Sequence, residues 1–329
     1  MRLAQLRLKA LVGSLQSRQD NDSSKLLASD FSIGAAFIVG TEGWVLVTQS
    51  PERGLGPALL WMHKYHLSRL NVIVDAQDTA GVMARRAQLF DLDVMVWFVD
   101  GNVLTAAKPA PVLLPLNVPD KYRLFSKTIE RAGATVVCEH GVLSGEVLGL
   151  EVCRVVNDPH IENKARLEIG VGSNDRELFQ MVNGSDASEE SLTNVVKTVL
   201  QHRQVGAAMH PLNRLGAERF LREVLIAKPG LVGAHHLNRA EPPVARSNLK
   251  DAIPCVAFGE ALNRPVVVVC SAIIDTDLVP FAADARLHLE PGAELVLAVA
   301  PNNVMPSMTH LADTLHQPAR FIVVDEFRR

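Results

Sequence analysis

Two uninterrupted apolar runs constrain the fold of this chain more than any other feature. They read PVVVVCSAII at residues 265–274 and AELVLAVA at residues 293–300. Neither run alternates polar and apolar residues, and a strand that is apolar at every position is buried on both of its faces. Strands of this kind belong to sheets that helices cover. The two runs therefore predict an α/β fold, with mostly parallel or mixed sheets flanked by helices.

The N-terminal part of the chain favours the same fold class. Short apolar segments rich in β-branched residues alternate there with longer segments that have the pattern of helices. Asp100 and Gly101 form a hairpin signal after the third apolar segment. We expect strands at 44–48, 70–75 and 93–99, and helices at 56–67 and 79–90. Strands that alternate with helices of this length predict a mostly parallel sheet.

A proline-rich segment divides the sequence. Residues 108–120 contain four prolines, which rules out a helix and disfavours a central strand. A chain of 329 residues is also long for a single hydrophobic core. We therefore expect an N-terminal α/β domain at 1–107, a linker at 108–120 and a C-terminal α/β domain at 121–329.

Charge and composition argue against two kinds of partner. The formal net charge is −3 and aromatic residues make up 5%, so the chain has neither the basic excess nor the aromatic surface that nucleic-acid binders usually show. It also contains no apolar run of the length that a membrane span needs. The sequence identifies no partner and leaves homo-oligomerisation open.

The cysteines indicate the cellular compartment. Cys138, Cys153, Cys255 and Cys270 each lie in or beside an apolar, strand-like run, and none forms a C-x-x-C motif. We expect them to be buried thiols. Basic residues near the N-terminus interrupt any apolar core of a signal peptide. Both features predict a cytoplasmic protein.

The strongest candidate for chemistry is a pair of glutamates. Glu151 lies within a long expected strand at 145–156, and Glu168 lies within a shorter one at 166–172. If the two strands form a hairpin, their carboxylates approach each other on one face. Paired carboxylates bind Mg²⁺ through hard oxygen ligands, and the bound ion activates water. The sequence thus predicts a magnesium site on this hairpin.

Further residues complete this hypothesis. Asp175 and Arg176 stand at the start of the next expected helix. Asp175 is a third candidate ligand for Mg²⁺, and Arg176 is placed to stabilise a phosphate group. His210 is a further candidate catalytic residue, because it lies beside an Asn and an Arg in the segment HPLNR. Glu151 and Glu168 complete the candidate catalytic set.

The order of elements in residues 121–204 resembles the restriction-endonuclease-like core, in which metal-binding carboxylates lie on such strands. The last motif of that family is acid, any residue, lysine, whereas this sequence reads Glu168-Ile169-Gly170. The resemblance implies a metal-dependent nuclease-like or phosphoester-acting domain, active or degenerate. In the alternative interpretation, Glu146, Glu151 and Glu168 are solvent-facing strand residues. The protein is then a non-catalytic binding or scaffold protein.

A weaker alternative is a nucleotide-binding protein. Gly54 and Gly56 precede an expected helix and Asp75 ends the next strand, which is loosely the layout of a dinucleotide fold. Leu59 stands where that motif has its third glycine. A second G-x-G junction, GVGSND at 170–175, also lacks the third glycine.

Three remaining features have simple structural interpretations. Asp275, Asp277 and Asp284 follow a buried strand, where they are either metal ligands or ordinary loop and capping residues. Arg85 and Arg86 on the helix at 79–90 are expected on its solvated face. The tripeptide Leu-Asn-Arg begins at residues 212, 237 and 262. The surrounding sequences differ, so chance recurrence is favoured over a repeat.

Overall fold

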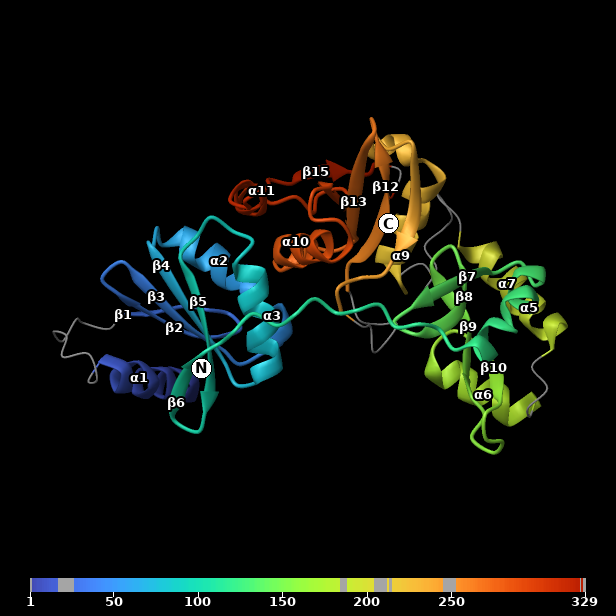
Figure 1. The fold of residues 1–329 in the computed structure, drawn as a ribbon, viewed down its shortest axis with the longest axis horizontal. Coiled ribbons are helices and arrows are strands. Elements are labelled where there is room, and N and C mark those ends of the chain that lie inside the picture. The colour runs from blue at the N-terminus through green and yellow to red at the C-terminus, as the bar shows by residue number, and fades with distance from the viewer. Residues whose placement is uncertain are drawn as a thin grey trace. The chain divides into compact units, whose positions relative to one another are not determined.

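The structure, a computed structural model, describes residues 2–16, 27–183, 188–203, 212, 215–244, 253–325 and 327. Helices and mixed or antiparallel sheets alternate along the chain, which confirms the predicted α/β class (Figure 1). The chain forms two compact units, which we describe separately. Unit 1 comprises Met1–Val112, Asp275–His288 and Met305–Arg320, and unit 2 comprises Leu113–Ile274, Leu289–Val304 and Phe321–Arg329.

Unit 1 is built on a six-stranded sheet with the strand order β1-β2-β3-β4-β5-β6. The central strands β3, β4 and β5 are parallel, and the outer strands pair antiparallel. The strands are β1 (Leu27–Ser29), β2 (Gly34–Val39), β3 (Glu42–Val47), β4 (Arg69–Val74), β5 (Val94–Asp100) and β6 (Val103–Ala106). The predicted Asp100-Gly101 turn joins β5 to β6, with Gly101 at a φ of 61°.

Helices cover both faces of this sheet. The helices of unit 1 are α1 (Arg2–Gln16), η1 (Pro51–Arg53), α2 (Leu55–Lys64), α3 (Gln77–Ala87), α10 (Leu278–Leu289) and α11 (Pro306–Asp313). Trp44 packs in one core cluster with Leu8 and Leu11 of α1. The next residue along β3, Gly43, points the other way, and a Cβ there would lie 2.5 Å from the Trp61 ring of α2. Strand alternation therefore assigns α1 and α2 to opposite faces.

Unit 2 contains a four-stranded antiparallel sheet with the order β10-β9-β8-β7. Its strands are β7 (Thr135–Glu139), β8 (Val142–Val147), β9 (Leu150–Asn157) and β10 (Ala165–Ile169). The helices around it are α4 (Asp120–Arg123), α5 (Ser126–Arg131), α6 (Ser173–Asn183) and α7 (Glu189–His202). The hairpin predicted between the long and the short strand is confirmed, since Glu168 of β10 pairs with Arg154 of β9.

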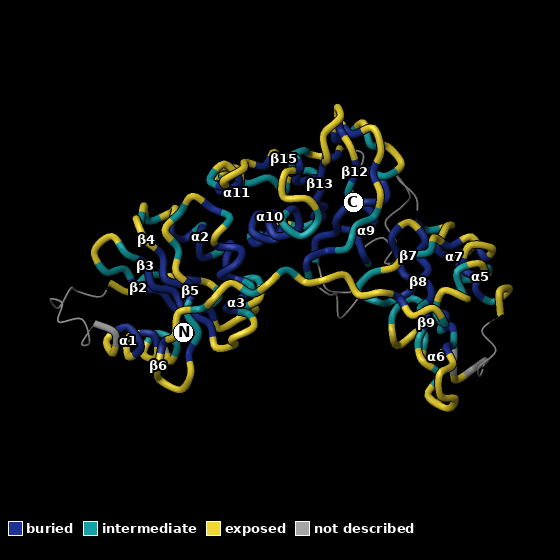
Figure 2. The backbone as a smooth tube through the Cα atoms, viewed as in Figure 1, coloured by how far each residue is buried: buried dark blue, intermediate teal, exposed yellow. Residues whose placement is uncertain are grey.

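A second sheet of unit 2 has five strands in the order β11-β12-β13-β14-β15. They are β11 (His236–Ala240), β12 (Cys255–Ala261), β13 (Arg264–Ser271), β14 (Glu294–Val299) and β15 (Arg320–Val323), accompanied by α9 (Ala217–Ala227) and η2 (Pro229–Val232). The apolar runs that predicted buried strands form β13 and β14, which are parallel. Val266 to Cys270 have no exposed surface, and Figure 2 shows this part of the chain as buried.

Several expectations differ from the structure. Residues 121–133, which have the sequence pattern of a single helix, contain two short helices, α4 and α5. The strands β11 and β12 were not expected, and they contain or flank two copies of Leu-Asn-Arg. The copy at 237 lies within β11, whereas Leu262 and Asn263 form the tight turn between β12 and β13 with positive φ angles. These two copies therefore occupy different structures, as chance recurrence predicts, while the copy at 212–214 lies mostly outside the described residues.

The division into units follows the predicted linker only in part. Unit 1 ends its first segment at Val112, inside the predicted linker at 108–120. Two later segments, 275–288 and 305–320, belong to unit 1 as well, although the sequence placed them in the C-terminal domain. Buried ion pairs between α3 and α10, described below, account for this assignment.

Candidate functional site

The polar face of the four-stranded sheet carries the glutamates that the sequence singled out. On β9, Glu151 is buried and accepts two hydrogen bonds from Arg154, at 3.0 and 2.9 Å. Residues three apart normally face opposite sides of a strand. A β-bulge after Gly145 of β8 gives β9 one extra residue, Val152, at this point. The bulge turns Glu151 and Arg154 to the same face.

Glu168 lies on this face too, because it pairs directly with Arg154 across the hairpin. The guanidinium of Arg176, in the first turn of α6, contacts Glu151 at 2.8 Å and Glu168 at 3.7 Å. Arg166 also pairs with Glu168, at 2.7 Å. The two predicted carboxylates therefore do converge, and the group between them is an arginine side chain.

The remaining predicted residues of this site have different surroundings. Asp175 turns back toward its own helix start, where its carboxylate accepts a hydrogen bond from the backbone N–H of Val171 at 2.7 Å. His210 lies outside the described residues. Within the part of the chain that the structure describes, no three His, Cys, Asp or Glu side chains are arranged to hold a metal ion.

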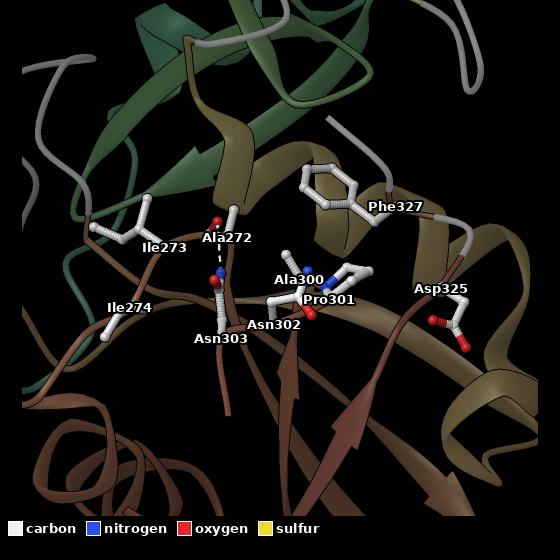
Figure 3. Close-up of a pocket in the computed structure, with 9 residues that line it drawn as sticks. All are labelled: Ala272, Ile273, Ile274, Ala300, Pro301, Asn302, Asn303, Asp325 and Phe327. Atoms are coloured by element: carbon white, nitrogen blue, oxygen red, sulfur yellow. Dashed lines mark hydrogen bonds between the residues drawn. The ribbon is translucent and has the colours of Figure 1, made fainter. Parts of the chain in front are cut away.

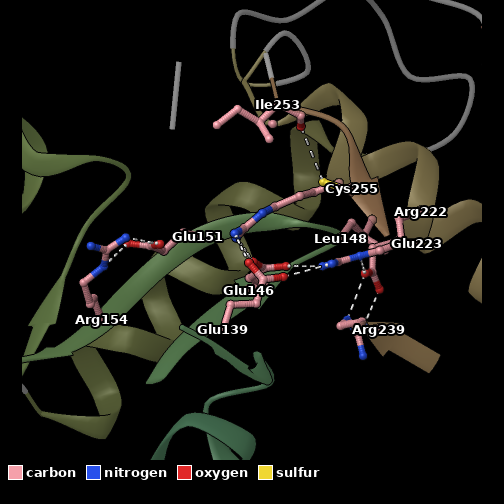
Figure 4. A network of polar contacts seen from close by, with 12 residues as sticks. Glu139, Glu146, Leu148, Glu151, Arg154, Arg222, Glu223, Arg239, Ile253 and Cys255 are labelled. Atoms are coloured by element: carbon pink, nitrogen blue, oxygen red, sulfur yellow. Dashed lines mark hydrogen bonds and ion pairs between the residues drawn. The ribbon is translucent and has the colours of Figure 1, made fainter. Parts of the chain in front are cut away.

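A second group of ion pairs joins α9 to the strands β7 and β8 of the same sheet (Figure 4). Arg219 and Arg222 of α9 reach Glu139 of β7, at 2.5 and 3.0 Å, and both also pair with the buried Glu146 of β8. Figure 4 shows the Glu139 and Glu146 carboxylates pointing together toward the Arg222 guanidinium. The alternative interpretation placed these glutamates on a solvated face, but Glu146 and Glu151 are buried and their charges are balanced by arginines.

The aspartates after the β13 strand belong to a third network, within unit 1. Asp284 of α10 accepts hydrogen bonds from both Arg85 and Arg86 at 2.8 to 3.0 Å. Asp277 pairs with Arg86 at 3.2 Å, and Asp275 pairs with Arg53 at 2.7 Å. The expectation that Arg85 and Arg86 face solvent was wrong, since only 5% and 2% of their surfaces are exposed.

Gly56 has a packing role in this network. Its backbone N–H donates to the Asp277 carboxylate at 2.7 Å, and a Cβ at this position would lie 2.0 Å from the carbonyl oxygen of Thr276. The glycine that suggested a phosphate-binding loop thus allows close approach of the segment before α10. Burial raises the pKa of Asp277 to about 7, although Arg86 and this N–H oppose the shift.

An open cavity of about 740 Å³ lies at the carboxyl ends of three adjacent strands in unit 2 (Figure 3). Residues 272–274 follow β13, residues 300–303 follow β14, and Asp325 and Phe327 follow β15; all of them line the cavity. Ligands of open α/β sheets bind at this edge. A volume of this size is also typical of small-molecule sites, which range over about 300–1,000 Å³.

The walls of the cavity combine apolar and polar groups. Asn303 donates its side-chain N–H to the carbonyl oxygen of Ala272 at 3.0 Å and so ties two of the loops together. Asn302 has a φ of 66°, a conformation that Asn tolerates. The Phe327 ring packs edge-on against Phe220 of α9, with centroids 5.6 Å apart. Among the described residues that line the cavity, Asp325 carries the only charge.

The sequence pointed to this edge of the sheet but not to these residues. The sequence pattern indicated the aspartates that follow the apolar strand at 265–274. It did not indicate Asn302, Asn303 and Asp325, although each follows a strand-like run. The signal that could have found them is their shared position after neighbouring strands.

Comparisons with protein-family models, with curated proteins and with solved structures find no match to this chain. Among the described residues, no helix is both long enough and apolar enough to cross a membrane.

Proposed function

We propose that this chain is a binding protein that takes up a small organic molecule in the cavity at the ends of β13, β14 and β15. The observation that carries the proposal is the convergence of three strand-end segments on one cavity that both polar and apolar side chains line. The described lining residues offer one carboxylate and two amides, and no nucleophile paired with a base. These groups recognise a ligand by hydrogen bonding, which supports binding rather than catalysis.

The lining also favours a class of ligand. Phe327, Ile273 and Ile274 supply apolar contacts for a ring of the ligand. The carboxylate of Asp325 accepts hydrogen bonds from hydroxyl or amino groups, as an acid at a strand end does for the ribose of a nucleotide. No lysine or arginine is among the described lining residues, so these residues offer a phosphate group no countercharge. A nucleoside fits these groups better than a nucleotide.

Calorimetric titration of the full chain with the four common ribonucleosides and their 5′-monophosphates tests this proposal. We expect at least one nucleoside to bind, and its monophosphate to bind more weakly. Asp325→Asn should weaken binding about 10- to 100-fold, because it removes a charged hydrogen-bond acceptor. Asp313→Asn, an exposed carboxylate on α11 away from the cavity lining, is the matched control. Binding of none of the nucleosides, or tighter binding of monophosphates, would contradict the proposal.

One observation favours a second candidate function, the metal-dependent nuclease-like or phosphoester-acting activity. Glu151 and Glu168 contact the same guanidinium, so one cation already lies between them. For Mg²⁺ to bind there, Arg176 has to move away and become available for a phosphate.

A titration with Mg²⁺ or Mn²⁺ separates the two candidates. A metal site on Glu151 and Glu168 predicts heat of binding that Glu168→Gln abolishes while the fold is retained. The binding-protein proposal predicts no heat, because Glu151 already accepts three hydrogen bonds from arginines.

A further inference from the structure

Cys255 and Cys270 face each other across two antiparallel strands. They are direct register partners on β12 and β13, and both belong to the core beneath α9. Directly opposed residues in an antiparallel pair point to the same face, with Cα atoms about 4.5–5.5 Å apart. A disulfide bridges Cα atoms about 4.4–6.8 Å apart. Both residues are thiols in the structure, and their placement allows a bond between them.

Two guanidiniums lie near Cys255, since Arg219 and Arg222 are buried and interact with it. Burial opposes the charge of Arg222, but the negative charge of Cys255 contributes most to raising the pKa of this guanidinium. The negative charge of Cys255 also raises the pKa of Arg219. The attraction is mutual, because a neighbouring cation stabilises a thiolate. Figure 4 shows Cys255 at the edge of this network, with its thiol directed toward the carbonyl oxygen of Ile253.

The surroundings of Cys270 keep its thiol protonated. It has no exposed surface, and burial raises its pKa well above the ordinary value for a thiol. The pair thus combines a sulfur near two cations with one that burial keeps protonated. In redox-active cysteine pairs one sulfur is oxidised and the second resolves the product.

We propose that Cys255 and Cys270 form a redox-responsive pair that a hydroperoxide converts into a cross-strand disulfide. The thiolate of Cys255 attacks one peroxide oxygen; an S–O bond forms and the O–O bond breaks, which leaves a sulfenic acid and, after protonation, water or an alcohol. The sulfur of Cys270 then attacks the sulfenic sulfur. An S–S bond forms, the S–O bond breaks, and water leaves with the Cys270 proton. The thiols lose two electrons and the peroxide gains them.

Peptide mapping of the full chain after peroxide treatment tests this pair. The folded protein is exposed to hydrogen peroxide, freed of it, denatured, alkylated and digested. We expect a linked peptide that contains Cys255 and Cys270, which disappears on reduction. Alkylation of both residues after treatment, or oxidation confined to the exposed Cys138, would overturn the proposal.

Cys153→Ser provides the matched control. Cys153 is equally buried and burial raises its pKa to about 12, but its register partner on β8 is Gly145, which has no thiol. This variant should still form the linked peptide. In Cys270→Ala, the sulfenic acid on Cys255 should persist and react with a dimedone probe. Labelling at Cys153 in place of Cys255 would contradict the assigned roles. If Cys270→Ala does not fold, the mapping of the unmodified chain decides the question.

Discussion

Gly56 shows how strongly a single residue constrains unit 1. A methyl group at this position would lie within 2.0 Å of a carbonyl oxygen of the segment before α10. We expect Gly56→Ala to lower the free energy of unfolding by about 1–3 kcal/mol, the usual range for overpacking. Urea denaturation measures the change. Gly13→Ala in α1 is the control, because no atom lies within 4 Å of its added methyl; it should stabilise the helix by about 0.5–1 kcal/mol.

Asp277 makes the stability of unit 1 depend on pH. Burial raises its pKa to about 7 in the folded protein, whereas an unfolded Asp titrates near 3.9. The folded state therefore binds a proton more tightly, so this contribution is complete below about pH 4 and is lost as the pH rises through 7. We expect the free energy of unfolding to fall by up to about 1.4 kcal/mol per pH unit within this window.

Asp277→Asn isolates this contribution. The amide preserves the shape of the side chain and cannot titrate, so the difference in stability between the variant and the natural chain should change between pH 5 and pH 8. A difference that stays constant over this range would show that Asp277 titrates at the same pH in both states.

At the scale of elements, Arg203 joins the end of α7 to two other segments of unit 2. Its side chain has no exposed surface, and it donates hydrogen bonds to the backbone carbonyls of Leu148, Leu212, Leu215 and Gly216 at 2.7 to 2.9 Å. Burial lowers its pKa to about 10, so it is charged at neutral pH. A guanidinium is suited to this task because its donors point in several fixed directions.

Replacing Arg203 by lysine keeps the positive charge but removes the guanidinium N–H groups that donate to these four carbonyls. We expect Arg203→Lys to lower the free energy of unfolding by about 3–5 kcal/mol, because buried carbonyls lose their partners. Arg131→Lys is the control: Arg131 is largely exposed and pairs loosely with Glu189, at 3.6 Å, so its replacement should change stability by less than about 0.5 kcal/mol. Equal effects of the two substitutions in thermal unfolding would refute the role of Arg203.

Elements were predictable from the sequence where their pattern is local. The strands β13 and β14 are apolar at nearly every position, and the hairpin of β9 and β10 needs only a short turn between two strand-like segments. By contrast, no residue type in the sequence indicates the β-bulge that turns Glu151 to the same face as Arg154. The burial of Arg85 and Arg86 depends on aspartates nearly 200 positions away, and no local pattern contains such a partner.

At the scale of the whole molecule, unit 1 is not contiguous in the sequence. Residues 1–112 contain its sheet, but Asp277 and Asp284 come from 275–288. A fragment of residues 1–112 would leave Arg85 and Arg86 buried without their countercharges, a loss of about 3–5 kcal/mol for each broken pair. We expect this fragment to unfold without cooperativity, as measured by calorimetry or circular dichroism. A fragment with the melting temperature of the full chain would contradict the discontinuous unit.

Cleavage of the folded chain tests the same assignment independently. The segment 108–120 is mostly exposed and rich in proline, so a protease should cut there first. Because α10 and α11 complete unit 1, the two products should remain associated in size-exclusion chromatography. Separation of two compact fragments under native conditions would support contiguous domains instead.

Methyl NMR of the full chain tests most directly whether a small molecule binds where β13, β14 and β15 end. Isoleucine methyl groups are labelled and a nucleoside is added to saturation. We expect shifts for Ile273 and Ile274, which line the cavity, and none for Ile73 in the core of unit 1 or Ile129 in the core of unit 2. Unchanged methyl signals of Ile273 and Ile274 with every nucleoside, or shifts confined to other isoleucines, would contradict it.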